Sequence, residues 1–125
     1  MFSTLRIALV SVAVTLTAPA LAQETVRGTL FVCDTQQQVE RLGEVFVGKA
    51  PEALTAVNAE ANNPVACVAV NAVFMPGKVL NTVRSKTHTF HVIPVIVLGV
   101  DTPNGLMPVE PKVFFTLRAV KEYSI

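Results

Sequence analysis

The feature that most constrains the fold of this chain is its single pair of cysteines, Cys33 and Cys67, in a sequence of 125 residues. Two cysteines in a protein that leaves the cytoplasm are most simply a disulfide. Closing a loop of this length stabilises a fold by about 4 kcal/mol in the chain-entropy model. The alternatives are two unpaired buried thiols or a reactive redox pair, although the sequence has no Cys-x-x-Cys motif.

Residues 1–22 have the pattern of a cleavable signal peptide. Arg6 is the only charged residue there, an apolar run follows to about Leu16, and Ala-Leu-Ala at residues 20–22 matches the small-x-small cleavage pattern. We therefore expect the mature chain to begin at Gln23 and to be periplasmic or secreted. An uncleaved anchor is the alternative, but the run is shorter than the ~20 apolar residues that span a bilayer. The mature form is thus not expected to span a membrane.

Charge and length limit the classes to which the mature chain, residues 23–125, can belong. The whole sequence has 10 Lys plus Arg and 9 Asp plus Glu. Removing the signal removes Arg6 and no acidic residue, so the mature chain is formally neutral. Neutrality argues against nucleic acid as a partner, because nucleic-acid-binding domains carry net positive charge. A chain of this length forms a single domain, with a core small enough that a covalent cross-link matters.

The segment between the cysteines is predicted to be a helical hairpin. Residues 29–33 favour a first strand. Asp34 then has the features of a helix N-cap, since Gln37 completes a capping box, and apolar residues recur at helical spacing up to a stop at Gly48. Pro51 suits the first turn of a second helix, which the Asn-Asn-Pro sequence at residues 62–64 ends.

From residue 65 onward the sequence predicts strands joined by short turns, at residues 65–75, 79–83, 90–100 and 113–120. A type II turn is predicted at Met75–Lys78, and another turn at Asp101–Gly105, followed by a link containing Pro108 and Pro111. Pro94 is expected to mark an edge or a bulge. The expected fold is α+β: a curved antiparallel sheet of about four to five strands, or a small barrel, with the two-helix hairpin packed on one side.

Basic residues provide the main candidate binding face. Arg84, Lys86 and His88 alternate along the chain and would share one face of an extended strand, with Lys78 nearby in the same hairpin. Such a row fits an anionic partner: a carboxylate, a phosphate, an acidic protein or an anionic envelope glycan. The alternatives are a solvated strand face, or charges that keep a sheet edge from pairing with another chain.

Catalytic and metal-binding patterns are weak in this sequence. His88 and His91 form a His-x-x-His motif, but residues three apart on a strand point to opposite faces, and no third ligand is evident. No nucleophile elbow or nucleotide-binding loop occurs, so no catalytic residue, metal or cofactor is assigned. A small metal-binding protein or enzyme that uses these histidines is the third candidate function.

Two further segments suggest contacts with other molecules. The loop at residues 101–107, with Asp101, Asn104 and Gly105, is a candidate inserting element for an inhibitor of a secreted hydrolase such as a lysozyme or a protease, because a rigid loop loses little entropy on binding. The apolar run at residues 90–98 is expected to be a core strand, and pairing with another chain through an exposed edge, including a second copy, is the alternative.

Three parts of the chain resemble a group of small exported bacterial proteins of unassigned function. They are Val32-Cys33-Asp34-Thr35 with Gln38-Val39-Glu40, Ala56-Val57-Asn58-Ala59-Glu60, and Asn63-Pro64 shortly before Cys67. The resemblance covers most of the mature chain and implies export and pairing of the cysteines, but no activity. The leading expectation is therefore a non-catalytic binding protein of the bacterial cell envelope, with hydrolase inhibition as the alternative.

Overall fold

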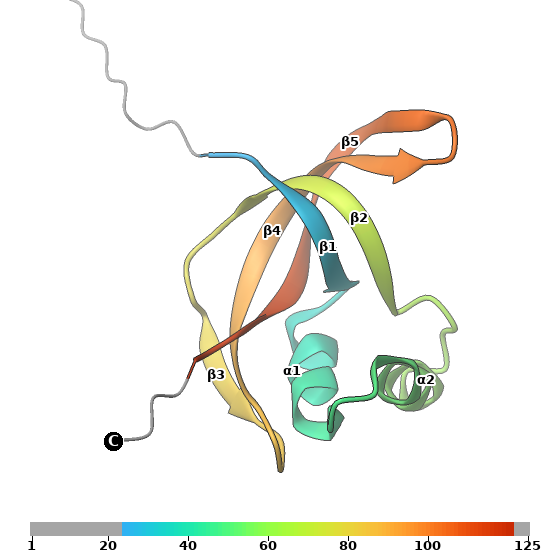
Figure 1. The fold of residues 1–125 in the computed structure, drawn as a ribbon. Coiled ribbons are helices and arrows are strands. Elements are labelled where there is room, and N and C mark those ends of the chain that lie inside the picture. The colour runs from blue at the N-terminus through green and yellow to red at the C-terminus, as the bar shows by residue number, and fades with distance from the viewer. Residues whose placement is uncertain (1–23, 122–125) are drawn as a thin grey trace, which may run out of the picture.

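The computed structural model describes residues 24–121 (Figure 1), so the predicted signal peptide and Gln23 lie outside the described residues. The described chain consists of five strands and two helices, in the order β1 (Val26–Cys33), α1 (Gln36–Val45), α2 (Ala50–Glu60), β2 (Cys67–Pro76), β3 (Asn81–Arg84), β4 (Thr89–Thr102) and β5 (Gly105–Ala119). The predicted α+β class is confirmed, with both helices on one side of the sheet. Within residues 24–121, no helix is long and apolar enough to cross a membrane.

The five strands form one antiparallel sheet in the order β2-β1-β5-β4-β3, and β2 also pairs with β4. The sheet therefore curls into a ring of β1, β2, β4 and β5. Pairing is extensive between β1 and β2, between β2 and β4, and between β4 and β5. Between β1 and β5 it is limited to the single pair Cys33–Phe115, so the ring stays open along most of that seam.

The disulfide predicted between Cys33 and Cys67 is present. It joins the last residue of β1 to the first residue of β2, which are register partners with Cα atoms 4.1 Å apart. Both cysteines are fully buried beneath the helices. Because Cys33 is also the residue that pairs with Phe115, the cross-link lies at the closed end of the β1–β5 seam.

The prediction of a type II turn at Met75–Lys78 is wrong. Strand β2 continues through this sequence to Pro76, and β3 begins only at Asn81. Both strands pair with the same edge of β4, and the chain between them stays alongside β4, because Gly77 N donates to Pro94 O at 2.8 Å and Leu80 N to Val92 O at 2.8 Å. The segment is therefore an interruption between two strands that pair with the same side of β4, and not the turn of a hairpin.

Proline positions explain two further departures from the sequence-based expectation. Pro94 lies within β4, which has partners on both sides, so it marks no sheet edge. It faces the break between β2 and β3. No strand pairs with that side of β4 there, so the missing N–H of Pro94 leaves no ladder hydrogen bond unformed. Pro108 and Pro111 lie within β5 and not in a link before it. The register of β4 and β5 shifts between Val97 and Gly99, which leaves extra β5 residues, 109–111, unpaired.

Helix α1 begins one residue later than its capping pattern predicted. Thr35 is the N-cap: its hydroxyl accepts from Gln38 N at 3.1 Å, and Gln38 Oε1 accepts from Thr35 N at 3.1 Å. Asp34 N donates instead to Ala66 O at 3.0 Å, which ties the start of the helical hairpin to the chain just before β2. Pro51 lies in the first turn of α2 as predicted.

Apolar side chains form two clusters, one on each face of the curved sheet. The outer cluster lies between the sheet and the helices, and its buried members are Cys33, Val39, Leu42, Ala53, Val57, Cys67, Val83, Phe90 and Val92. The inner cluster lies within the ring of strands, and its buried members are Val32, Ala72, Ile93, Val95 and Val97. Strand β5 contributes to both, because Phe115 and Leu117 pack against the outer cluster and Phe114 against the inner one.

Candidate functional site

Of the predicted row of Arg84, Lys86 and His88, only Arg84 lies on a strand, as the last residue of β3. Residues Ser85–His88 form the turn between β3 and β4, in which Ser85 N donates to His88 O at 2.8 Å and Ser85 Oγ accepts from His88 N at 3.0 Å. The strand premise is therefore wrong, although all three residues line a shallow hollow of about 150 Å³ around this turn. Lys78 lies in the segment between β2 and β3, outside the β3–β4 hairpin.

The ring of His88 belongs to an aromatic group on the helix side of the sheet. It stacks on Phe90 with centroids 5.7 Å apart and makes a T-shaped contact with Phe46, with centroids 5.0 Å apart. Its Nδ1 lies 2.7 Å from Thr87 Oγ1. These contacts give His88 a packing role at the end of α1.

A different set of basic residues shares one sheet face: Arg84 on β3, His91 on β4 and Arg118 on β5. Their neighbours in sequence, Val83, Phe90 and Leu117, all pack in or against the outer cluster under the helices, so the alternating residues point to the opposite face. His91 is directly opposite Arg118 in the β4–β5 register, and Arg84 lies across from Thr89, two residues before His91. We call these three residues the basic face.

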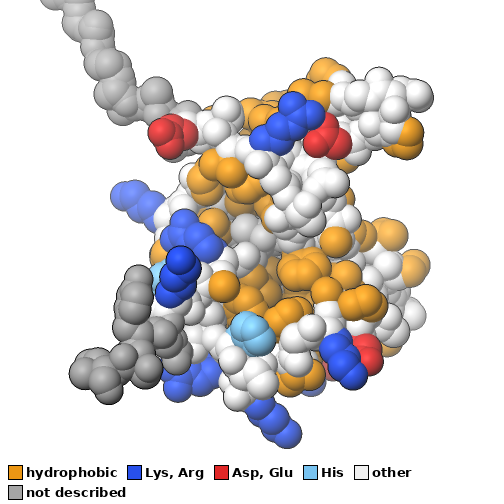
Figure 2. All heavy atoms as spheres, in the orientation of Figure 1, with side chains coloured by type: hydrophobic (Ala, Val, Ile, Leu, Met, Phe, Trp, Pro, Cys, Tyr) orange, Lys and Arg blue, Asp and Glu red, His pale blue; other side chains and the backbone are white. Residues whose placement is uncertain are grey.

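Figure 2 shows Lys and Arg side chains along the left flank, over β3 and the last part of β5. Side chains that are directly opposite on paired strands lie about 4.5–5.5 Å apart at Cβ, and diagonal neighbours about 7–8 Å apart. A single anion can therefore contact more than one member of the basic face. Sequence reasoning considered His91 only as a metal ligand and did not single out Arg118, because only the strand register, not local spacing, places them beside Arg84.

A cleft of about 230 Å³ opens beside the basic face, between β1 and β5. Its lining residues come from four strands: Val26, Thr29, Leu30, Phe74, Pro76, Ile93, Thr116, Leu117 and Arg118. Three of them, Leu30, Phe74 and Ile93, belong to or pack against the inner cluster. The cleft therefore leads from the basic face into the apolar interior of the ring.

Thr116 is the one residue of residues 24–121 with a buried side-chain oxygen or nitrogen that lacks a hydrogen-bond partner. Thr116 is one of the residues that line the cleft, and it is only 3% exposed. A buried hydroxyl without a partner is unfavourable, by roughly 1–3 kcal/mol. The cleft thus combines apolar walls, one hydrogen-bonding group in its depth and the guanidinium of Arg118 at its edge.

The groove between α1 and α2 is bridged by an ion pair. Arg41 Nε lies 3.0 Å from Glu60 Oε1, and Arg41 Nη2 lies 3.1 Å from Glu60 Oε2. This bidentate hydrogen bonding holds the pKa of the Glu60 carboxyl below its usual value and raises the pKa of Arg41. Both side chains are exposed, and the pair connects the two helices.

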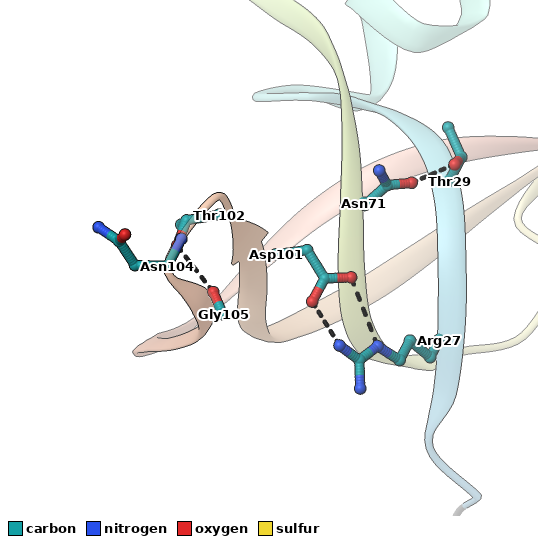
Figure 3. A network of polar contacts seen from close by, with 7 residues as sticks. All are labelled: Arg27, Thr29, Asn71, Asp101, Thr102, Asn104 and Gly105. Atoms are coloured by element: carbon teal, nitrogen blue, oxygen red, sulfur yellow. Dashed lines mark hydrogen bonds and ion pairs between the residues drawn. The ribbon is translucent and has the colours of Figure 1, made fainter.

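The candidate inserting loop is a tight turn at the end of the long β4–β5 hairpin (Figure 3). Thr102 Oγ1 donates to Gly105 O at 2.7 Å and accepts from Asn104 N at 3.2 Å. Asp101 is engaged by Arg27 of β1, whose Nη2 lies 2.5 Å from Asp101 Oδ1. Of the predicted contact residues, Asn104 alone extends its side chain away from the network (Figure 3).

Metal coordination receives no structural support from the two histidines. His88 packs beside Phe46, whereas His91 points to the face away from the helices. Across residues 24–121, no group of three or more His, Cys, Asp and Glu side chains is arranged to hold a metal ion.

Comparison of this chain with known protein families, with curated proteins and with solved structures found no match in any of the three.

Proposed function

We propose that this chain is a non-catalytic binding protein of the bacterial cell envelope, and that it takes an anionic partner on the basic face. The observation that carries the proposal is the register that sets His91 opposite Arg118, with Arg84 on the same face. Within the described part of the chain, neither His91 nor Arg118 forms an ion pair with a carboxylate. Their donors are thus available to a partner.

The chemistry of these groups favours an oxyanion. A guanidinium offers paired N–H donors that match a carboxylate or a phosphate, and such charge-assisted hydrogen bonds are stronger than neutral ones. Because the mature chain is formally neutral, the basic face is a local feature and not part of a general positive field. Local charge of this kind supports recognition of a defined anion over non-specific attraction.

An NMR titration of the exported protein tests this proposal, with pyrophosphate and polygalacturonate as separate probes. We expect amide shifts centred on His91 and Arg118 for at least one probe, and an Arg118→Glu variant that binds it at least tenfold more weakly. Lys49→Glu is the matched control, because it makes the same change in charge at an exposed side chain at the start of α2. Equal affinity in both variants, or no shift with either probe in the wild type, would contradict the proposal.

Export is part of the same proposal and has its own test. The signal-like residues 1–22 and the resemblance to small exported bacterial proteins support it, and a disulfide fits an oxidising compartment. After expression of the full-length sequence in a bacterium, N-terminal sequencing of the periplasmic fraction is expected to begin at Gln23. Recovery of the full-length, reduced chain from the cytoplasm would oppose it.

Inhibition of a secreted hydrolase is the second candidate, and the shape of the β4–β5 hairpin favours it. The hairpin projects beyond the rest of the sheet (Figure 1), its turn is held by Thr102, and Leu106 and Met107 beside the turn are about half exposed, at 45% and 52%. An exposed, pre-formed turn loses little entropy on insertion. A panel of lysozymes and secreted proteases tests this candidate, and Met107→Asp should relieve any inhibition found.

A further inference from the structure

The β1–β5 seam has the form of a wedge that is closed at one end. Cys33 pairs with Phe115 at that end and is fixed there by the disulfide to Cys67. Beyond this pair β1 and β5 form no ladder, and the cleft occupies the space between them. The wedge therefore gives access from the surface to the inner cluster, which elsewhere is enclosed by paired strands.

The depth of the cleft is suited to an aliphatic group. Its walls there are Leu30, Phe74 and Ile93, all members or neighbours of the inner cluster. The volume of about 230 Å³ is below the roughly 300–1,000 Å³ of pockets that enclose whole drug-sized ligands. At roughly 30 Å³ for each water-sized group, it holds seven to eight methylene-sized groups, which is most of the alkyl chain of a ten-carbon carboxylate.

The β5 wall of the cleft is suited to an anion. Thr116 and Arg118 both line the cleft, and as residues i and i+2 of β5 they point to the same face. Their Cα atoms are separated by about two strand residues, or roughly 6.6–6.8 Å. A carboxylate between them can accept from the Thr116 hydroxyl through one oxygen and from the Arg118 guanidinium through the other.

We infer that the cleft between β1 and β5 binds a free, medium-chain aliphatic carboxylate. The chain lies along Leu30, Phe74 and Ile93, and the carboxylate meets Thr116 and Arg118. The inference rests on the proposed function, because Arg118 of the basic face supplies the charge, and it adds the class of ligand. A strand of a partner protein inserted at the seam is the competing occupant. Its backbone would pair with main-chain groups and would leave the buried Thr116 hydroxyl without a hydrogen-bond partner.

Calorimetric titration of the exported protein with decanoate, below the concentration at which it forms micelles, tests the inference. Acetate is the head-group control, and we expect it to bind at least tenfold more weakly. Thr116→Val is nearly the same shape and removes only the hydroxyl. It should weaken decanoate binding about fivefold or more while the free energy of unfolding stays the same or rises.

A second variant tests the cleft without touching the charged group. Val26 lines the cleft and is 41% exposed, so Val26→Trp can be tolerated at the rim while it blocks entry. It should abolish decanoate binding and leave pyrophosphate binding unchanged. If pyrophosphate binds in an Arg118-dependent manner but decanoate binds no better than acetate, the inference fails and the proposed function stands.

The remaining outcomes separate other sources of the same chemistry. Decanoate binding that Arg118→Glu leaves unchanged would contradict the carboxylate contact. Flotation with phosphatidylglycerol vesicles is expected to recover no protein, whereas recovery on vesicles without decanoate binding would overturn the inference in favour of a lipid surface. Capture of a polypeptide that Val26→Trp abolishes, again without decanoate binding, would overturn it in favour of an inserted strand.

Discussion

The side chain of Asn58 forms hydrogen bonds with both the backbone N–H and the backbone C=O of Cys67. Its Oδ1 accepts from Cys67 N at 2.8 Å, and its Nδ2 donates to Cys67 O at 3.0 Å and to Pro64 O at 3.0 Å. Helix α2 thereby fixes the first residue of β2 and its disulfide. Asp34 N, next to Cys33 in the chain, donates to Ala66 O, next to Cys67. The end of β1, helix α2 and the start of β2 therefore meet around the cross-link.

Replacing Asn58 by alanine should therefore destabilise the domain. The change leaves the N–H and C=O of the buried Cys67 without their partner, and unmet buried groups cost about 1–3 kcal/mol. Chemical denaturation followed by circular dichroism measures the loss. Asn104→Ala is the matched control, because that side chain is exposed and extends away from the polar network (Figure 3). Equal stabilities for the two variants would show that the Asn58 bonds contribute little.

Removal of the disulfide should cost about 2–5 kcal/mol, the range found for small secreted domains. Beyond the entropy of the unfolded chain, the cross-link lies at the closed end of the β1–β5 seam. In a Cys33→Ser, Cys67→Ser double variant, we expect a lower unfolding temperature. We also expect faster amide hydrogen exchange in β1 near Phe31 and Val32 than in the centre of β4. Uniform loss of protection throughout the sheet would contradict a local effect at the seam.

Local patterns in the sequence predicted most of the elements and the cross-link. In the predicted last strand, for example, Phe115 and Leu117 pack against the outer cluster and Phe114 against the inner one, as the alternation of a strand requires. The errors arose where a local signal met a tertiary constraint. The Pro-Gly sequence after Met75 favours a turn, but β4 provides partners for both β2 and β3, and hydrogen bonding along that edge outweighs the turn preference.

The candidate site was less accessible to sequence reasoning, for a physical reason. Lys86 and His88 alternate with Arg84, but alternation defines a face only on a strand, and the Ser85 hydroxyl stabilises a turn there by accepting from Thr87 N and His88 N. Arg118 lies far along the chain from His91, and they become neighbours only through the β4–β5 register. The cleft depends on the divergence of β1 from β5, which no single segment encodes.

Gly43 allows close packing of α1 on the sheet, so Gly43→Ala is expected to be destabilising. A Cβ at this position would lie 2.5 Å from Val83 Cγ2 and 3.2 Å from Leu117 Cδ2. Overpacking of this kind costs about 1–3 kcal/mol, which exceeds the ~1 kcal/mol that alanine gains over glycine in a helix. Adding Val83→Ala should recover part of the loss, as a double-mutant cycle would show.

Gly28→Ala is the control for this prediction, because a Cβ there meets no atom within 4 Å. We expect its free energy of unfolding to stay close to that of the wild type. If Gly43→Ala raised the stability instead, the helix preference would outweigh the contact with Val83, and α1 would have room to move away from the sheet.

The ion pair of Arg41 and Glu60 should make the stability of the helical hairpin depend on pH in one direction. Arg41 lowers the pKa of Glu60 through hydrogen bonding and charge, so the folded state favours the ionised carboxylate. This contribution is present above the pKa of the unfolded chain and is lost as the pH falls through the lower folded value. This contribution is small because both side chains are exposed.

In Arg41→Gln, the pKa of Glu60 measured by NMR should rise towards its ordinary value, whereas in Lys49→Gln it should stay where it is in the wild type. An unchanged Glu60 titration in Arg41→Gln would mean that the pair does not persist in solution and that α1 and α2 are joined through apolar packing alone.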